Sequence, residues 1–564
     1  MKFKDYKYER TNFDTLKSEI DKLVEQLKHA DTYEVFKTAF DKADEVLSHA
    51  ESMYSLMHVR HTIDTTDAFY DAENTFWDEH IPILMGISSK ISKIVLDSPF
   101  RPELENEVPM TYFWKAENAL KSYDEKIVGD LQEENRLVSE YEKLIAKAQI
   151  EFEGETYTLA SLGGKMDDPD VATREGAHKA YWGYMEEHES EIDDIYDRLV
   201  KVRAKIAKEL GFNNFIELGY VRMNRFDYNA DDVATYRKQI LSDVVPVATR
   251  LYDAQKKRLG VNTLAVYNNG YEFTTGNPTP KYDKDQMVKI AQNMYHELSE
   301  PTGEFFDYMV NNELLDLVAK PGKRGGGYCT FISDYASPFI FSNFNGTAGD
   351  VDVLTHEAGH AFQVYSSRNI KPSDCIWPTY ESAEIHSMSM EFFAWPWMPK
   401  FFEEDVEKYY YTHLGGAIKF LPYGITVDHF QHEVYANPEM TPSERKAAWR
   451  KLEKQYLPHK DYSDIPFLDK GTWWFRQAHI FSDPFYYVDY TLAQVVALQF
   501  WLRLQNKDAN AFSDYYEICK LGGTLPFRQI VAKANLKDPF SEGCLADVMD
   551  KISQYYDTID DTKL

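Results

Sequence analysis

The chain has 564 residues, 43% of them apolar and 15% aromatic, and its 62 basic and 92 acidic side chains give a formal net charge of −30. Apolar and aromatic residues occur along the whole length, which argues against a disordered chain, and a protein of this size needs no disulfides to build a core. The excess of acid argues against nucleic acid or an anionic membrane as the main partner, because proteins that bind these carry clustered Lys and Arg.

The cysteines and the N-terminal segment indicate in which cellular compartment the protein is expected. The four cysteines are scattered and form no CxxC pair, so we expect neither a disulfide framework nor a thiolate metal cluster. Residues 1–23 are charged throughout and lack the apolar core of a secretory signal. No segment reaches 18 uninterrupted apolar residues. We therefore expect a cytoplasmic protein in a reducing compartment.

Amphipathic helices dominate the predicted elements. Apolar residues recur at helical spacing over residues 16–27 and again over 137–148, and both segments leave a charged outer face. Gly211 follows a cation-rich helix end, and Thr441 begins a capping box with Glu444. These signals predict a mostly α fold. The polar stretch 163–170 is the best candidate boundary, which gives an N-terminal helical domain over 1–170 and a second helical domain over 171–564.

Few segments are typical of strands. Residues 156–159 form one candidate. The segments 327–332 and 338–344 are rich in aromatic and β-branched residues and predict a hairpin or small sheet. This sheet would lie directly before the segment that carries the chemistry.

Residues 356–360 read His356-Glu357-Ala-Gly-His360 within an apolar helical pattern. Side chains four apart share one face of a helix, so both imidazoles can reach one ion, while Glu357 can touch a metal-bound water without becoming a ligand. Chance alone would produce the pattern about 0.04 times in a chain of this composition. Two imidazoles and a carboxylate suit Zn²⁺, with a fourth position left for water. We therefore predict one zinc ion per chain.

A second helix, predicted over residues 377–391, offers the third ligand. Glu381 and Glu384 are neighbours at i, i+3 on one stripe, so geometry alone leaves the choice between them open. His386 points elsewhere. A further pair, His429 and His432, shares a helix face, but no third ligand is near it, and we interpret it as part of an ordinary helix.

These residues resemble the thimet oligopeptidase/oligoendopeptidase F family of zinc metallopeptidases, in its oligoendopeptidase F and Pz-peptidase branch. In that family the HExxH helix is followed by a helix that carries Glu, with a second acid seven residues later, and Glu384 and Glu391 reproduce this spacing. The Gly-rich loop 322–329 and the following residues 337–340 are also similar. The resemblance covers at least residues 320–492.

The resemblance implies a fold and a set of site residues. It implies two helical halves that flank a deep channel, with the small β-sheet next to the HExxH helix. Glu384 becomes the third metal ligand, with Glu381 as the alternative, and Glu391 orients a ligand histidine. The glycine loop, with Gly326 and Gly327, becomes a mobile loop and strand edge that an extended peptide can join.

A peptide hydrolase also needs donors for the developing oxyanion. In the family a His followed by a tyrosine cluster supplies them. His479 and Tyr490 match best, and Tyr486 and Tyr487 are expected to contact the substrate. Tyrosine clusters are common in a chain with 39 tyrosines, so an ordinary packing role for some of them is a real alternative.

We therefore predict a zinc-dependent endopeptidase of short peptides in which Glu357 is the general base. A metallocarboxypeptidase or dipeptidyl carboxypeptidase on a similar helical shell is the nearest rival. Such an enzyme would use a cation, Arg324 or Arg476, to hold the C-terminal carboxylate of its substrate. A peptide-binding protein without catalysis is the other alternative, although it would have no use for Glu357. The expected partners are oligopeptides, and the oligomeric state is unknown.

Overall fold

The computed structural model describes residues 1–564. Helices make up most of the chain, as predicted, and the strands form one sheet of two strands and one of three. No helix combines the length and the apolar character that a membrane crossing requires. All four cysteines are free thiols.

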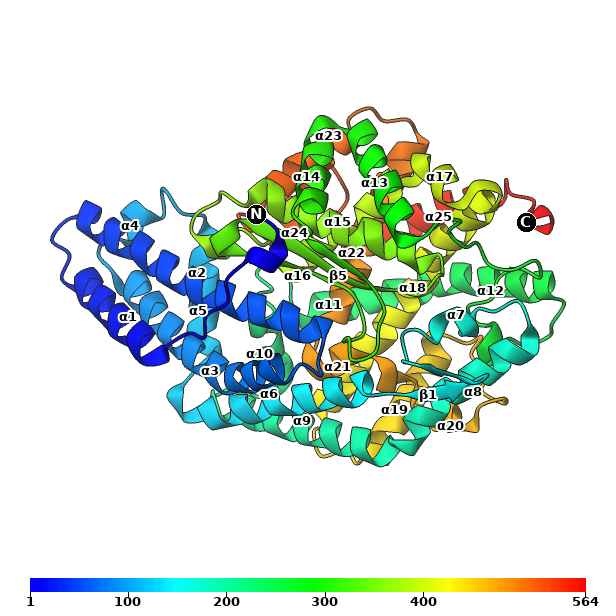
Figure 1. Ribbon diagram of the computed structural model, residues 1–564, viewed down its shortest axis with the longest axis horizontal. Coiled ribbons are helices and arrows are strands. Elements are labelled where there is room, and N and C mark those ends of the chain that lie inside the picture. Colours follow the sequence, from blue (N-terminus) through cyan, green and yellow to red (C-terminus); the bar gives the residue numbers. More distant parts are fainter.

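The N-terminal helices pack together in the left half of the molecule in Figure 1, drawn in blue to cyan. They are α1 (Phe13–Lys28), α2 (Tyr33–Ile63), α3 (Ala68–Asp97), α4 (Arg101–Leu104), α5 (Met110–Ser122) and α6 (Val128–Ala146). The predicted apolar stripe of α1 is buried, since this helix packs on α2 and α3. Helix α6 buries its stripe as well but ends at Ala146, before the predicted limit at residue 148.

The predicted strand at residues 156–159 is shorter than expected and has a partner that the sequence did not indicate. Strand β2 (Glu155–Tyr157) pairs antiparallel with β1 (Ile150–Phe152). Glu153 and Gly154, which join them, both have positive φ, the backbone of a tight hairpin turn. The boundary predicted near residue 170 falls between α7 (Gly163–Met166) and α8 (Val171–Glu187) and stays a prediction.

The remaining helices precede or follow the larger sheet along the chain. Those before the larger sheet are α9 (Glu189–Glu209), α10 (Phe215–Arg222), α11 (Ala230–Gln239), α12 (Val245–Leu259), α13 (Lys284–Leu298) and α14 (Glu300–Asn311). Those after it are α15 (Gly349–Ser367), α16 (Tyr380–Phe393), α17 (Pro399–Phe402), α18 (Val406–Ala436), α19 (Pro442–Tyr456), α20 (Pro466–Asp469), α21 (Ala478–Ser482), α22 (Tyr487–Gln505), α23 (Ala511–Leu521), α24 (Phe527–Lys533) and α25 (Cys544–Tyr556). Helix α9 ends before Gly211, and α19 begins with the predicted capping box.

The predicted hairpin before the HExxH segment is confirmed and forms part of a larger sheet. Strand β4 (Tyr328–Ile332) pairs antiparallel with β5 (Ser337–Phe344). A strand that the sequence did not predict, β3 (Leu315–Val318), pairs parallel with the other side of β5. The order β3-β5-β4 buries β5 in the centre and leaves β4 as an edge strand.

Helix α16 packs against both α15 and α22 in the core of the molecule, and α15 packs on strand β5 (Figure 1). Nearly all of its residues are buried, including the polar ones, so it has no outer face. Gly359 on α15 is the point of closest approach, because a Cβ atom there would lie 2.5 Å from the His386 carbonyl oxygen and 2.7 Å from Ser387 Cα. Glycine therefore sets the separation of the two helices.

The substitution Gly359→Ala should lower the free energy of unfolding by about 1–3 kcal/mol, because the backbone of α16 must move to admit the methyl group. Gly183→Ala is the matched control, since Gly183 is an exposed helical glycine with no atom within 4 Å of the added Cβ. That change should stabilise the protein by about 1 kcal/mol. Thermal unfolding at one scan rate compares the three proteins, and equal midpoints for Gly359→Ala and the wild type would contradict the packing argument.

Candidate active site

Helices α15 and α16 bring three candidate metal ligands together. The candidate ligand atoms of His356, His360 and Glu384 all lie within 4.8 Å of one another. Glu384 Oε2 is 3.2 Å from His356 Nε2 and 3.3 Å from His360 Nε2. The two histidines are one turn apart on α15, and the glycine contact at residue 359 allows α16 to supply the carboxylate.

The structure separates the two glutamates between which spacing could not choose. Glu381 is buried but is not part of the group around the histidines. Burial and the nearby charge of Asp489 raise the pKa of Glu381 well above its usual range. His386 points away from the site, as expected, with its Nδ1 3.5 Å from Cys519 Sγ.

The three side chains fit a divalent cation. Burial opposes the charge of Glu384, yet His360 and His356 hold the pKa of this carboxylate well below its usual range. Buried polar atoms beside the group also lack partners, namely Glu357 Oε2 and His360 Nδ1. A divalent ion would bind the ionised carboxylate and the two imidazoles. A water molecule on that ion would give the unpaired Glu357 oxygen a hydrogen-bond partner.

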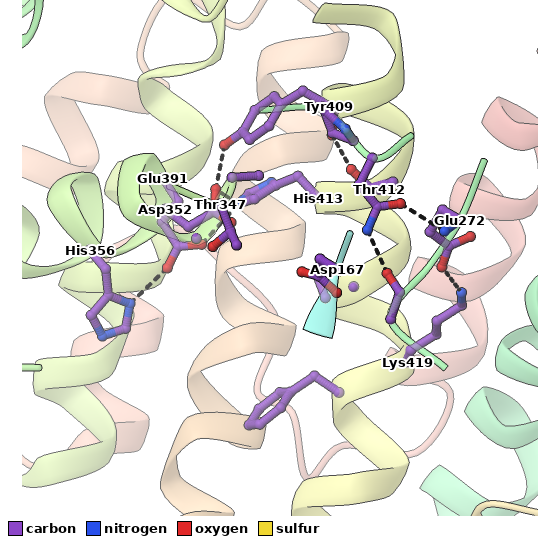
Figure 2. Close-up of a pocket in the computed structure, with 18 of the residues that line it drawn as sticks. Asp167, Glu272, Thr347, Asp352, His356, Glu391, Tyr409, Thr412, His413 and Lys419 are labelled. Atoms are coloured by element: carbon purple, nitrogen blue, oxygen red, sulfur yellow. Dashed lines mark hydrogen bonds and ion pairs between the residues drawn. The ribbon is translucent and has the colours of Figure 1, made fainter. Parts of the chain in front are cut away.

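A chain of hydrogen bonds fixes the orientation of His356. Its Nδ1 donates to Glu391 Oε1 at 2.7 Å, which leaves Nε2 free to face the metal position. Glu391 Oε2 accepts from His413 Nε2 at 2.9 Å, and His413 Nδ1 accepts from Trp395 Nε1 at 3.1 Å. Figure 2 shows His356, Glu391 and His413 along one side of the cavity. Sequence reasoning missed His413 and Trp395, since no local pattern links them to the motif.

Glu384 is held from two further directions. Ser387 Oγ donates to Oε2 at 2.8 Å, and the Tyr486 hydroxyl donates to Oε1. Tyr486, which the sequence suggested as a substrate contact, therefore bonds directly to the candidate ligand.

His479 and Tyr490, the predicted oxyanion donors, are hydrogen-bonded to each other. His479 Nε2 is 3.0 Å from the Tyr490 hydroxyl, and Gln477 Nε2 donates to His479 Nδ1 at 2.9 Å. Gln477 Oε1 in turn accepts from Tyr423 at 2.7 Å. Because Nδ1 accepts, the proton of a neutral His479 is on Nε2. Burial lowers the pKa of His479 and raises that of Tyr490, so both are neutral donors near pH 7. Sequence reasoning also missed Gln477.

Two buried arginines anchor the segment that carries these residues. Arg203 donates to the carbonyl oxygens of Ile480 and Phe481 and pairs with Glu134 at 2.7 Å. At the other end Arg225 donates to the Phe485 carbonyl oxygen. Charged donors thus satisfy carbonyl groups of the short helix α21 and of the loop before α22.

Two cavities meet at the candidate metal position. One has a volume of about 810 Å³ and the other about 630 Å³, and both are lined by His356, His479 and Tyr490. Figure 2 shows the larger one, with Asp352 and Tyr409 near Glu391 and the pair Glu272–Lys419 on another wall. Tyr487 lines the larger cavity.

The glycine loop and the start of the edge strand β4 line the smaller cavity. Gly326 and Gly327 line it, and a Cβ on Gly327 would lie 3.2 Å from Glu357 Oε1. The loop is tied to β5, because Asn343 Nδ2 donates to the carbonyl oxygens of Arg324 and Gly326 at 2.8 Å. Because Gly327 has no side chain, its backbone can lie close to Glu357, the candidate base.

The other residues singled out in the sequence lie elsewhere. His429 and His432 bond to Tyr456 and Tyr220, respectively, and belong to no metal-binding group. Of the two candidate carboxylate anchors, Arg324 lines the smaller cavity and pairs with Glu142 at 2.5 Å. Arg476 is exposed and pairs with no acid.

Comparisons with known proteins identify the family of this chain. The profile of the peptidase M3 N-terminal domain matches residues 3–123, and that of peptidase family M3 matches residues 165–550. A structure of Pz peptidase A with an inhibitor is 49% identical, covers 100% of both chains and superposes with a TM-score of 0.99. One assigned as oligoendopeptidase F from Bacillus anthracis is 51% identical, with a TM-score of 0.94, over 100% of this chain and 99% of that one.

A curated relative, an oligoendopeptidase F homolog of Borreliella burgdorferi, is 22% identical over 547 residues, which are 93% of this chain and 87% of the relative. The family match covers most of the chain, and the helical fold is that of the solved structures above. The chain therefore belongs to peptidase family M3 and is a peptidase.

Proposed function

We propose that this protein is a zinc-dependent oligoendopeptidase that hydrolyses internal bonds of short peptides. The observation that supports this most strongly is the position of the metal-binding group where two cavities meet. An endopeptidase needs room for the chain on both sides of the bond it cuts, and a cavity on either side provides it. Sites closed on one side favour exopeptidases.

His356, His360 and Glu384 would hold the zinc ion, one per chain, because two imidazoles and a carboxylate are a common catalytic zinc set that leaves one position open. When bound, Zn²⁺ would lower the pKa of a water molecule toward about 7 and polarise the scissile carbonyl.

Glu357 would act as the general base and acid. Burial raises the pKa of Glu357, although His356 and His360 oppose this. A carboxyl group with a raised pKa is suited both to take a proton from the attacking water and to deliver it to the leaving amine near neutral pH. The unpaired Oε2 is the atom available for this transfer.

His479 and Tyr490 would stabilise the negative charge on the carbonyl oxygen. Both are neutral donors, and the Gln477 contact keeps the His479 proton on Nε2. The edge strand β4, with Gly326 and Gly327, would pair with the main chain of an extended peptide, and Tyr486 and Tyr487 would contact its side chains.

Peptides blocked at both ends test this function against the carboxypeptidase rival. Internally quenched peptides with an acetylated N-terminus and an amidated C-terminus should be cut, and a chelator should abolish the cutting. Cleavage restricted to peptides with a free C-terminus would support the rival, and tight peptide binding without turnover would support a binding protein.

The variant Glu357→Gln should keep its metal and lose most of its turnover, by at least about 10²-fold, because the carboxamide cannot accept the proton. Metal content by atomic absorption and kcat on one quenched peptide are the two measurements. Activity equal to the wild type would remove Glu357 from the role of base.

The variants Glu384→Gln and Glu381→Gln form a matched pair, since both residues are buried glutamates on α16. Glu384→Gln should lose most of its bound metal because the charged oxygen facing both imidazoles is replaced. Glu381→Gln should keep its metal. The reverse result in metal stoichiometry would assign the ligand to Glu381.

A further inference from the structure

Arg476 is a solvent-exposed cation that has no acid as partner. It ends the short helix η9 (Trp473–Arg476), shortly before His479 along the chain. Buried Arg203 and Arg225 are paired with carboxylates, and buried Arg174, which has no acid, donates to carbonyl oxygens instead. Arg476 has neither kind of partner, so its charge is available to a ligand.

The side chain of Arg476 lies among aromatic rings and is open to solvent. Its side chain is exposed to solvent, yet burial by the surrounding protein opposes its charge. The guanidinium carbon lies 5.5 Å from the ring centre of Tyr181 and 5.6 Å from that of Trp473. The hydroxyls of Tyr181, Tyr423 and Tyr487 act against burial and raise the pKa of Arg476.

Lys460 is a second cation on the same indole ring. Its Nζ lies 3.6 Å from the ring centre of Trp473 and has no carboxylate partner. Burial lowers the pKa of Lys460 to about 8, and Arg476 contributes to this by repulsion. Glu453 is the acid that acts against this shift, and it is already paired with Arg450 at 3.1 Å.

This cationic pair is next to the catalytic machinery. Gln477, which follows Arg476, donates to His479 Nδ1 at 2.9 Å. Tyr487, whose hydroxyl influences the pKa of Arg476, lines the larger cavity, and its ring centre is 5.1 Å from that of His479. A peptide that extends from the metal position through the larger cavity would therefore approach the two cations.

We propose that Arg476, supported by Lys460, forms a subsite that binds a carboxylate of the peptide substrate. A guanidinium offers two parallel N–H donors that match a carboxylate, and the lysine adds a second positive charge. The hydroxyls of Tyr181 and Tyr487, which influence the pKa of Arg476, supply further donors. This inference rests on the proposed function, because it assigns the class of peptide that the enzyme prefers.

The carboxylate comes from one of two sources, the C-terminus of the peptide or the side chain of an Asp or Glu. Both present the same group to Arg476. In either case the subsite holds the carboxylate of the peptide at a set distance from the metal position. This distance determines which bond of a short peptide reaches the metal position for cleavage.

Two pairs of quenched peptides test the subsite. One pair differs only in a free or amidated C-terminus, and the other, amidated in both members, carries Asp or Asn at each position of a scan. In the pair that carries the recognised carboxylate, the wild-type kcat/KM should be about tenfold to hundredfold higher for the charged peptide than for the uncharged one, mainly because KM is lower. Arg476→Gln should bring this ratio close to 1, and Arg476→Lys should retain part of it. Arg136→Gln removes one exposed surface charge and should leave the ratio unchanged.

A loss of the ratio in the first pair assigns the subsite to the C-terminus, and a loss in the second pair assigns it to a side chain. Kd values for the same peptides on the Glu357→Gln protein, by fluorescence anisotropy, separate binding from turnover. If no protein cleaves any peptide, the proposed function fails and the Kd ratio alone decides the subsite. A wild type without charge preference in Kd and kcat/KM, or an Arg476→Gln protein that keeps the preference while folded, would overturn the proposal.

Discussion

The close contact between α15 and α16 is the constraint on which the site depends. Its donor atoms come from two helices, so their distance apart is set by helix packing and not by the motif itself. Gly359 lies inside the motif and has no side chain between the helices, so the His386 carbonyl oxygen can lie only 2.5 Å from the point that a Cβ atom would occupy. A residue within the motif thus brings Glu384 to both imidazoles.

Around this contact the buried carboxylates Glu391 and Glu384 have hydrogen-bond partners. Glu391 is held by His356 and His413, and Glu384 is held by His356, His360, Ser387 and Tyr486. Arginines satisfy the carbonyl groups of the irregular segment before α22. Glu357 Oε2 is left without a partner beside the metal position, and it is the atom that the proposed proton transfer requires. Hydrogen bonds to Glu384 and His356 hold these side chains in one geometry before the substrate arrives.

Local signals predicted the elements whose causes are local. The apolar stripe of α1, the capping box of α19 and the hairpin of β4 and β5 follow from residue spacing within one segment. Strand β3 escaped prediction because its four residues have no pattern of their own and pair with β5 only across an intervening segment that contains β4. Strand β1 was missed for a similar reason, since its partner and the tight turn at Gly154 define it.

Residue spacing alone was enough to establish that the chain is mostly helical and that His356, Glu357 and His360 share one helix, because a period of 3.6 residues is a property of the backbone. It left Glu381 and Glu384 equivalent, since both face one stripe. The packing of the folded chain was needed to show which glutamate faces the imidazoles, which side chains hold His356 and His479, and that Arg476 donates to no group of the protein. These relations join residues far apart in the chain, and the packing of one helix against another has no signature in the spacing of either.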